Sequence, residues 1–209
     1  MVMKRFPIDI SKNTSKYAIS YFSEISKIHK KLDVQKIDEI TNILIKCYKD
    51  RKNLFVCGNG GSSAISNHFV CDHQKGVGSD TTLLPKIISL SANIEIITAI
   101  GNDIEFDEIY TYQLSRLANK GDCLLTVSSS GNSKNIISAI KWANNNNLKT
   151  ISLNGFSGGK ANKLSNISLN VPSKNYGIVE DIHQSIMHIM AQSIKMKFLK
   201  ISNTDNLVF

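Results

Sequence analysis

The sequence predicts an α/β domain in which helices cover both faces of a parallel β-sheet. From residue 53 onward, short apolar runs alternate with stretches of helical periodicity, which is the pattern of strands joined by crossover helices. Two of the apolar runs lead into loops rich in Gly or Ser, and each loop leads into a helix. The chain has 209 residues, enough for one such domain and a helical extension.

The helical extension lies at the N-terminus. In residues 13–50, apolar side chains recur every three or four positions, from Tyr17 to Leu32 and again from Ile37 to Cys47. This spacing predicts two helices joined near Asp33. Their apolar faces need a partner, so we expect residues 1–50 to pack on the main domain or on a neighbouring subunit.

The main domain is predicted to span residues 51–200. Its strands are expected at 54–57, 86–90, 123–127, 150–153 and 167–171. Its helices are expected from the first loop to about 74, and at 94–100, 105–118, 133–145 and 179–199. Residues 201–209 are expected to form a flexible tail.

Composition argues against several classes of protein. The formal net charge is +8, but the Lys residues are scattered rather than gathered in the basic stripe of a nucleic-acid-binding protein. No run of about 18 apolar residues is present, so no membrane span is predicted, and the N-terminus lacks the apolar core of a signal peptide. Four Cys residues without a CxxC pair indicate reduced thiols, so we expect a cytoplasmic protein.

The first loop, residues 58–63, reads GNGGSS and follows the first predicted strand. Its glycines let a ligand approach backbone N–H groups, and the N-terminus of the next helix favours an anion. The last glycine of a dinucleotide-binding loop is replaced by Ser63, and the Gly-Lys-Ser/Thr ending of a P-loop is absent. The loop is therefore either a sugar- or anion-binding turn or a turn without a ligand.

The second loop, residues 128–133, reads SSSGNS and is called the serine loop below. It also follows a predicted strand and precedes a predicted helix. One Ser would suffice to cap that helix, whereas four hydroxyls can donate hydrogen bonds to phosphate oxygens. We therefore favour phosphate binding over a solvated turn.

The chain resembles the sugar isomerase (SIS) family, and within it the phosphoheptose isomerase branch, over about residues 35–198. The motifs that carry the resemblance are CGNGGSS at 57–63, NHF at 67–69, AIGND at 99–103, SSSGNS at 128–133, NGFSGGK at 154–160 and IHQSIMH at 182–188. The resemblance implies a single SIS domain with a five-stranded parallel sheet in a three-layer αβα sandwich. It also implies a homotetramer with active sites at subunit boundaries.

The resemblance also assigns roles to individual residues. The phosphate-binding positions are matched by Ser128, Ser129, Ser130 and Ser133. The positions that line the sugar site are matched by Asn59, Gly60 and Ser62. Asp103 matches an acidic residue that contacts sugar hydroxyls. Asp72 stands where the family usually has the Glu proposed as catalytic base, and His188 matches the proposed acid–base histidine.

A metal set is predicted from four residues: His68, Asp72, Glu180 and His188. The first two are four positions apart and the last two are eight apart, so each pair shares a face of a predicted helix. Two imidazoles and two carboxylates suit Zn²⁺, and the resemblance implies zinc on the matching positions, where the family usually has Gln at 180. We expect about one Zn²⁺ per subunit and no organic cofactor.

Other side chains near these motifs are expected to be structural. His29 and His73 have this interpretation, and Cys71 is expected to pack in the core, although its thiolate could bind metal. His183 is three residues from Glu180, so it is either a neighbour in the site or a core residue.

The implied activity is that of a ketose–aldose isomerase, with proton transfer through an enediol by Asp72, His188 and Glu180. The expected substrate is sedoheptulose 7-phosphate, and the product D-glycero-D-manno-heptose 7-phosphate would feed surface polysaccharide (lipopolysaccharide or capsule) synthesis. Asp72 is one methylene shorter than Glu, a displacement that matters for catalysis, so the role of base can shift to Glu180. The alternatives are a non-catalytic tetrameric SIS scaffold that binds a replication initiator, and a SIS isomerase for a different phosphosugar.

Overall fold

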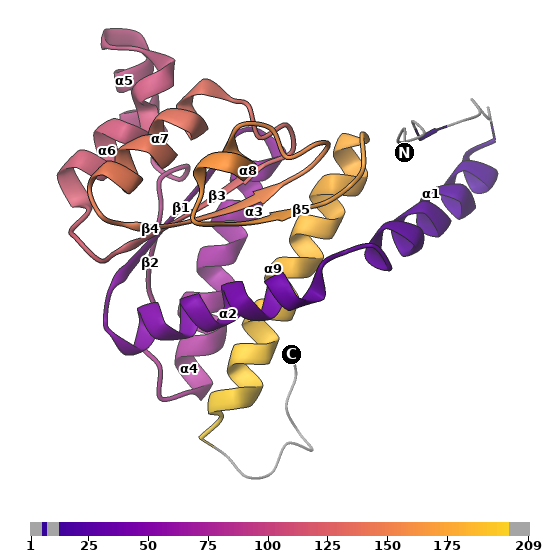
Figure 1. Ribbon diagram of the computed structural model, residues 1–209, viewed down its shortest axis with the longest axis horizontal. Coiled ribbons are helices and arrows are strands. Elements are labelled where there is room, and N and C mark those ends of the chain that lie inside the picture. The colour runs from indigo at the N-terminus through magenta and orange to yellow at the C-terminus, as the bar shows by residue number, and fades with distance from the viewer. Residues whose placement is uncertain (1–5, 8–12, 201–209) are drawn as a thin grey trace.

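The computed structural model describes residues 6–7 and 13–200 (Figure 1). The predicted tail at 201–209 lies outside the described residues. The five strands are β1 (Asn53–Gly58), β2 (Lys86–Ser89), β3 (Cys123–Ser128), β4 (Lys149–Asn154) and β5 (Ile167–Asn170). All pairings are parallel, and the strand order is β2-β1-β3-β4-β5. The predicted α/β fold with a five-stranded parallel sheet is confirmed.

Helices form a layer on each face of the sheet (Figure 1). One layer contains α2 (Val34–Lys49), α3 (Gly61–Val70) and α9 (Tyr176–Phe198). The other contains α6 (Ile109–Leu117), α7 (Lys134–Asn145) and α8 (Ala161–Leu164), with α5 (Ile94–Asp103) and the short η2 (Phe106–Glu108) beside them. The three-layer arrangement places the functional loops at one edge of the sheet.

Alternate residues of each strand pack into two separate cores. In β3, Leu125 belongs to the core under α2, α3 and α9, whereas Leu124 belongs to the core under α6 and α7. Both side chains are completely buried. A strand buried on both faces reads as a continuous apolar run, which explains why the sequence pattern located these strands.

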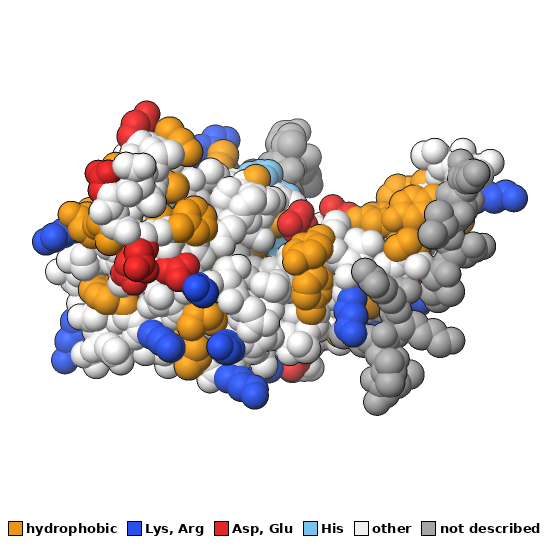
Figure 2. All heavy atoms as spheres, turned by 90° about the horizontal axis from the view of Figure 1, so that it is seen from above, with side chains coloured by type: hydrophobic (Ala, Val, Ile, Leu, Met, Phe, Trp, Pro, Cys, Tyr) orange, Lys and Arg blue, Asp and Glu red, His pale blue; other side chains and the backbone are white. Residues whose placement is uncertain are grey.

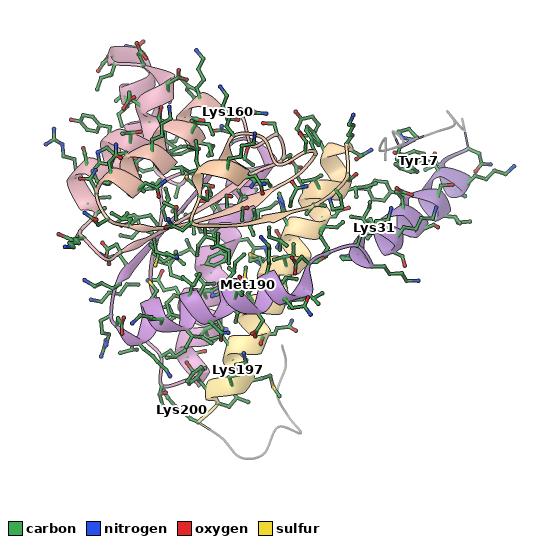
Figure 3. The ribbon with its side chains drawn as sticks, viewed as in Figure 1. Tyr17, Lys31, Lys160, Met190, Lys197 and Lys200 are labelled. Atoms are coloured by element: carbon green, nitrogen blue, oxygen red, sulfur yellow. The ribbon has the colours of Figure 1, made fainter. Side chains whose placement is uncertain are left out.

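The helix α9 crosses the whole molecule and is held at several points. Asn175 caps its N-terminus by accepting a hydrogen bond from the Ile178 N–H at 3.1 Å, so the helix begins three residues before the predicted start. Met190, in the part that α2 crosses, is completely buried (Figure 3). Near the other end, Lys197 forms an ion pair with Asp38 of α2 at 3.4 Å. The helix is therefore a fixed support for the side chains it presents.

The helix α3 continues without a break into a π-helix, η1 (Cys71–Val77), and a short α4 (Gly78–Asp80). The sequence pattern predicts an α-helix to about residue 74. It did not predict the π-helix, whose turns are wider because they contain an extra residue. The buried His73 ring stacks on Phe69 with a centroid distance of 3.9 Å. The Tyr48 hydroxyl forms a hydrogen bond of 2.8 Å with Nδ1 of His73. These contacts anchor η1 to the core, and π-helical turns often occur at functional sites.

The helix α1 (Thr14–His29) projects from the body of the protein, as Figure 1 shows. Tyr21 donates a hydrogen bond to Asp181 of α9 at 2.8 Å, but Ile19 and Phe22 are about 70% exposed. Figure 2 shows apolar side chains gathered on this arm and at the opposite end of the molecule, with Lys and Arg side chains dispersed. None of the helices in the described residues has the length and apolar character needed to cross a membrane.

Candidate active site

The first loop and the serine loop meet at one edge of the sheet. Strand β1 pairs with β2 on one side and with β3 on the other, so the chain changes direction across the sheet between β1 and β3. The loops that follow these two strands are neighbours at their carboxyl ends. In open α/β sheets, ligands bind in the crevice at this switch point.

The serine loop lines a small pocket of about 130 Å³. Its walls are formed by Asn59, Ser62, Val127, Ser128, Ser129, Ser130, Ser133, Tyr176 and Glu180. The Ser129 hydroxyl is buried and has no hydrogen-bond partner among the described residues. The Ser133 hydroxyl makes no capping bond to α7. Hydroxyls left without partners at the N-terminus of a helix are available to an anion.

The turn after β4 supports the serine loop from behind. The Gly155 N–H donates to the Ser129 carbonyl at 3.1 Å, and the Ala161 N–H donates to the Gly131 carbonyl at 2.9 Å. Gly131 has a φ of +63°, and a side chain there would collide with the carbonyl of Gly158. Only glycine fits this position, so the backbone fixes the shape of the loop before any ligand binds.

The predicted sugar-lining residues of the first loop have different positions. Asn59 and Ser62 line the serine-loop pocket, whereas Gly60 forms the turn before α3. The Asn59 amide exchanges two hydrogen bonds of 2.9 Å with the amide of Asn135. It also accepts one from the Tyr110 hydroxyl at 3.0 Å. Asn59 therefore also connects the first loop to α7 and α6.

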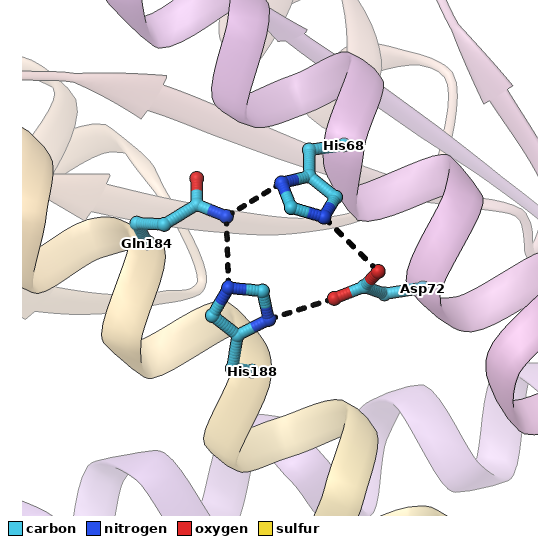
Figure 4. A network of polar contacts seen from close by, with 4 residues as sticks. All are labelled: His68, Asp72, Gln184 and His188. Carbon is cyan, nitrogen blue, oxygen red and sulfur yellow. Dashed lines mark hydrogen bonds and ion pairs between the residues drawn. The ribbon is translucent and has the colours of Figure 1, made fainter. Parts of the chain in front are cut away.

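Four side chains from two helices form a closed ring, which we call the histidine cluster: His68, Asp72, Gln184 and His188 (Figure 4). Asp72 lies 3.2 Å from Nε2 of His68 and 2.7 Å from Nδ1 of His188, each through one carboxylate oxygen. The Gln184 amide nitrogen lies 2.7 Å from Nδ1 of His68 and 3.0 Å from Nε2 of His188. The structure therefore brings three of the four predicted metal residues together across α3, η1 and α9.

The cluster fits a divalent cation by its chemistry. Ligand atoms of His68, Asp72 and His188 all lie within 4.8 Å of one another. Two imidazoles and one carboxylate form the usual protein ligand set of catalytic zinc sites, which leaves one position open. Glu180 is not part of this group, so its assignment as a metal ligand stays a prediction.

A cavity of about 500 Å³ opens beside the cluster. It is lined by Cys71, Asp72, Lys75, Gly76, His188, Ala191, Gln192 and Lys195. The prediction that Cys71 packs in the core is wrong, because its side chain is exposed. Cys71 is the first residue of η1 and lies on the side of this helix that lines the cavity.

Glu180 lies in the serine-loop pocket, on the same face of α9 as the cluster. Tyr176, Glu180, Gln184 and His188 follow one another at intervals of four residues, so they form one stripe along the helix. Burial, and then the neighbouring Asp181 carboxylate, raise the pKa of Glu180 above its usual value. Glu180 sits against Gly61, where a Cβ atom would be 2.5 Å from its Oε2. The carboxyl group thus lies at the N-terminus of α3.

The remaining predicted residues lie outside both pockets. Asp103 ends α5, where its exposed side chain accepts a hydrogen bond from Asn102 at 2.7 Å. Its role as a sugar contact stays a prediction. His183 is completely buried and lies 3.0 Å from the Asn154 carbonyl through its Nε2. Burial lowers the pKa of His183 to about 4 and that of His73 to about 3, so both are neutral core residues.

Gln184 is the residue of the cluster that the sequence analysis missed. It lies one turn before His188 on the predicted last helix, and that spacing was the available signal. A polar residue on an exposed helix face carries no such meaning by itself. Only the contact with His68, which is distant in sequence, distinguishes it.

Comparisons with known proteins agree with this fold. The family model of the SIS domain matches residues 20–155, so the chain belongs to the SIS domain family. A phosphoheptose isomerase of Aliarcobacter butzleri is 37% identical over 158 residues, which are 76% of this chain and 83% of that protein. One of Helicobacter pylori is 33% identical over 169 residues, 78% of this chain and 84% of that protein.

Solved structures give the same result. The structure of a phosphoheptose isomerase from Francisella tularensis superposes with a TM-score of 0.80 at 29% identity. The match covers 88% of this chain and 99% of that one. The resemblance to the phosphoheptose isomerase branch is confirmed.

Proposed function

We propose that this chain is an aldose–ketose isomerase that converts sedoheptulose 7-phosphate into D-glycero-D-manno-heptose 7-phosphate. The observation that carries the proposal is the stripe on α9. Glu180 lines the serine-loop pocket and His188 belongs to the histidine cluster, so one helix face connects an anion site to an acid–base site. The named activity of the relatives supports the same reaction.

The spacing along α9 suits a seven-carbon substrate. Eight residues of α-helix separate Glu180 from His188, a rise of about 12 Å. Three single bonds of an extended chain span about 3.6 Å, so the roughly eight bonds from phosphorus to the first carbon of a heptose 7-phosphate span about 10 Å. Shorter sugars would leave one of the two sites unfilled. The serine loop then binds the phosphate while the carbonyl end reaches the cluster.

The reaction requires only proton transfer. A base takes the proton from the carbon beside the carbonyl, and the electron pair forms the double bond of an enediol while an acid protonates the carbonyl oxygen. Return of the proton from the base to the former carbonyl carbon gives the aldose, while the hydroxyl on the first carbon loses its proton to the conjugate base of the acid. Asp72 contacts both histidines of the cluster, whereas Glu180 lies in the pocket that we expect to bind the phosphate. We therefore assign the role of base to Asp72, which lies at the carbonyl end, and that of acid to His188.

The site also suits a divalent ion, zinc by its ligand set, held by His68, Asp72 and His188. Such an ion supplies positive charge opposite the oxyanion that develops on the substrate. No organic cofactor is required by this chemistry, since no electrons are gained or lost overall.

Association into a homotetramer belongs to the same proposal. It is supported by exposed apolar side chains at two ends of the protomer: Ile19 and Phe22 on α1, and Ile94 and Phe106 at α5 and η2 (Figure 2). Exposed patches of this kind mark interfaces in soluble proteins. We also propose that the enzyme is cytoplasmic and takes part in surface polysaccharide synthesis.

The test is turnover in D₂O. The protein is incubated with sedoheptulose 7-phosphate, with and without Zn²⁺, and the aldose is followed by NMR spectroscopy. Proton transfer predicts deuterium at the second carbon of the product and loss of turnover in His188→Ala. Ribulose 5-phosphate and fructose 6-phosphate serve as shorter substrates and should react poorly. Absence of turnover under every condition, or equal efficiency with the shorter sugars, would contradict the proposal.

A further inference from the structure

We propose that Gln184 is a positioning residue that determines which ring nitrogens of His68 and His188 face the cation, and that its amide turns over when the cation binds. The inference rests on the metal centre of the proposed function. It concerns Gln184, which lies within the IHQSIMH stretch but was given no role in the sequence analysis. Four contacts define the histidine cluster, three of them hydrogen bonds and the fourth the ion-pair contact between His68 and Asp72 (Figure 4).

With both imidazoles neutral and no cation bound, the ring of contacts has one consistent set of hydrogen positions. The Gln184 amide nitrogen has two hydrogens, which it donates to Nδ1 of His68 at 2.7 Å and Nε2 of His188 at 3.0 Å. A neutral imidazole has one accepting nitrogen and one N–H. His68 therefore carries its hydrogen on Nε2, which lies 3.2 Å from one oxygen of Asp72. His188 carries its hydrogen on Nδ1 and donates it to the other oxygen at 2.7 Å.

The opposite orientation of the amide fails in this state. With Oε1 toward the rings, His68 and His188 would place their N–H groups toward Gln184. Their lone pairs would then face the ionised carboxylate of Asp72, a repulsive arrangement. Because the orientation of an amide follows from its hydrogen-bond network, the nitrogen faces the rings in the metal-free protein.

A cation on the Asp72 side reverses these requirements. It needs lone pairs on Nε2 of His68 and Nδ1 of His188, so each ring must move its hydrogen to the nitrogen that faces Gln184. The amide NH₂ cannot accept these hydrogens, whereas Oε1 has two lone pairs and accepts both. A half-turn of the amide therefore satisfies the loaded site. Metal-bound histidines commonly donate their second N–H to an oxygen in this way.

The negative charge of Asp72 favours a cation on the Asp72 side of the two rings over one on the Gln184 side. Asp72 belongs to the group of ligand atoms within 4.8 Å, and it contributes a negative charge that a neutral amide lacks. A cation between Gln184 and the rings would instead take Oε1 as a ligand and leave both ring hydrogens on the Asp72 side. The two arrangements thus differ in the tautomers of the loaded protein.

Nitrogen NMR of the histidine rings tests the proposal directly. In ¹⁵N-labelled protein without metal, His68 should carry its hydrogen on Nε2 and His188 on Nδ1. Addition of Zn²⁺ should exchange these positions in both rings, while the buried His73 and His183 remain unchanged as internal controls. Tautomers of His68 and His188 that stay the same after zinc binding would overturn the proposal.

Metal affinity gives a second test, measured by calorimetry without any sugar. Gln184→Met removes both hydrogen-bonding groups and should weaken Zn²⁺ binding about 10- to 100-fold. Gln184→Glu keeps two accepting oxygens and adds charge, so it should bind Zn²⁺ more tightly than the unmodified protein. Gln35→Met, at an exposed position of α2, is the matched control.

Equal affinities of the Gln184→Met variant and the unmodified protein would overturn the proposal, as would absence of zinc binding. Failure of the isomerase proposal is separate, because it appears as absence of turnover in a protein that still binds zinc with the predicted order of affinities.

Discussion

The serine-loop pocket and the histidine cluster lie on one face of α9 but are held in shape by different means. The serine loop is fixed by the backbone, because the turn after β4 donates hydrogen bonds to its carbonyls. The cluster is fixed by side chains that contact one another, and His68 and His188 are 47% and 40% exposed. We therefore expect the pocket to contribute binding and the cluster to contribute chemistry.

The largest effect is expected in the cluster. Asp72→Asn removes the carboxylate that contacts both histidines, so kcat should fall about 100- to 10,000-fold while KM stays nearly unchanged. Steady-state kinetics with sedoheptulose 7-phosphate measure both constants. Asp38→Asn, which alters an exposed carboxylate of α2, is the control. A proportional change in KM would contradict the division between binding and chemistry.

A substitution in the serine-loop pocket should change KM more than kcat, and its effect should be smaller than that of Asp72→Asn. Ser129→Ala removes a hydroxyl that we expect to bind phosphate, and hydrogen bonds to charged groups contribute about 1.5–3 kcal/mol. KM should rise about 10- to 100-fold, with a lesser change in kcat. Since this buried hydroxyl has no partner in the described protein, the melting temperature should not fall. An unchanged KM would exclude Ser129 from the phosphate site.

Glu180 should produce the smallest effect, one of stability. Burial and Asp181 raise its pKa above 4.5, so the folded protein binds this proton more tightly than the unfolded chain. The resulting stabilisation is present below pH 4.5 and is lost as the pH rises through the raised pKa. Glu180→Gln keeps a neutral side chain at every pH.

The melting temperature of Glu180→Gln relative to the unmodified protein should therefore increase between pH 4 and pH 7. Thermal unfolding at several pH values measures this difference. Glu39→Gln changes an exposed carboxylate and should show no such trend. A difference that is constant with pH would mean that Glu180 is as well solvated in the folded protein as in the unfolded chain.

The fold could be predicted from the sequence because its strands are buried on both faces. Each predicted strand overlaps an observed strand, and its last residue lies within two residues of the last residue of the observed strand. The start of α9 was missed because a cap at Asn175 acts through one side chain and not through apolar periodicity. The π-helix was missed for a related reason, since one extra residue in a turn leaves the apolar pattern nearly unchanged.

The site was predicted less completely than the fold. Motif spacing identified His68, Asp72 and His188, because residues four apart share a helix face and the family resemblance connected the two helices. It could not distinguish Glu180 from Gln184, which lie one turn apart on the same stripe. Their separation between pocket and cluster depends on where α3 crosses α9, which is a property of tertiary packing.

The π-helix gives this protein a place where its specificity can change without loss of its chemistry. His68 and Asp72 lie at or before the start of the wide turns, whereas Lys75 and Gly76 lie within them and line the large cavity. Loss of one residue from η1 would restore an ordinary helical turn, which takes up the deletion so that α4 and the elements beyond it keep their place. Only the side chains of the turn itself would then face the cavity differently, so a single deletion would change the lining of the cavity and leave the rest of the fold intact.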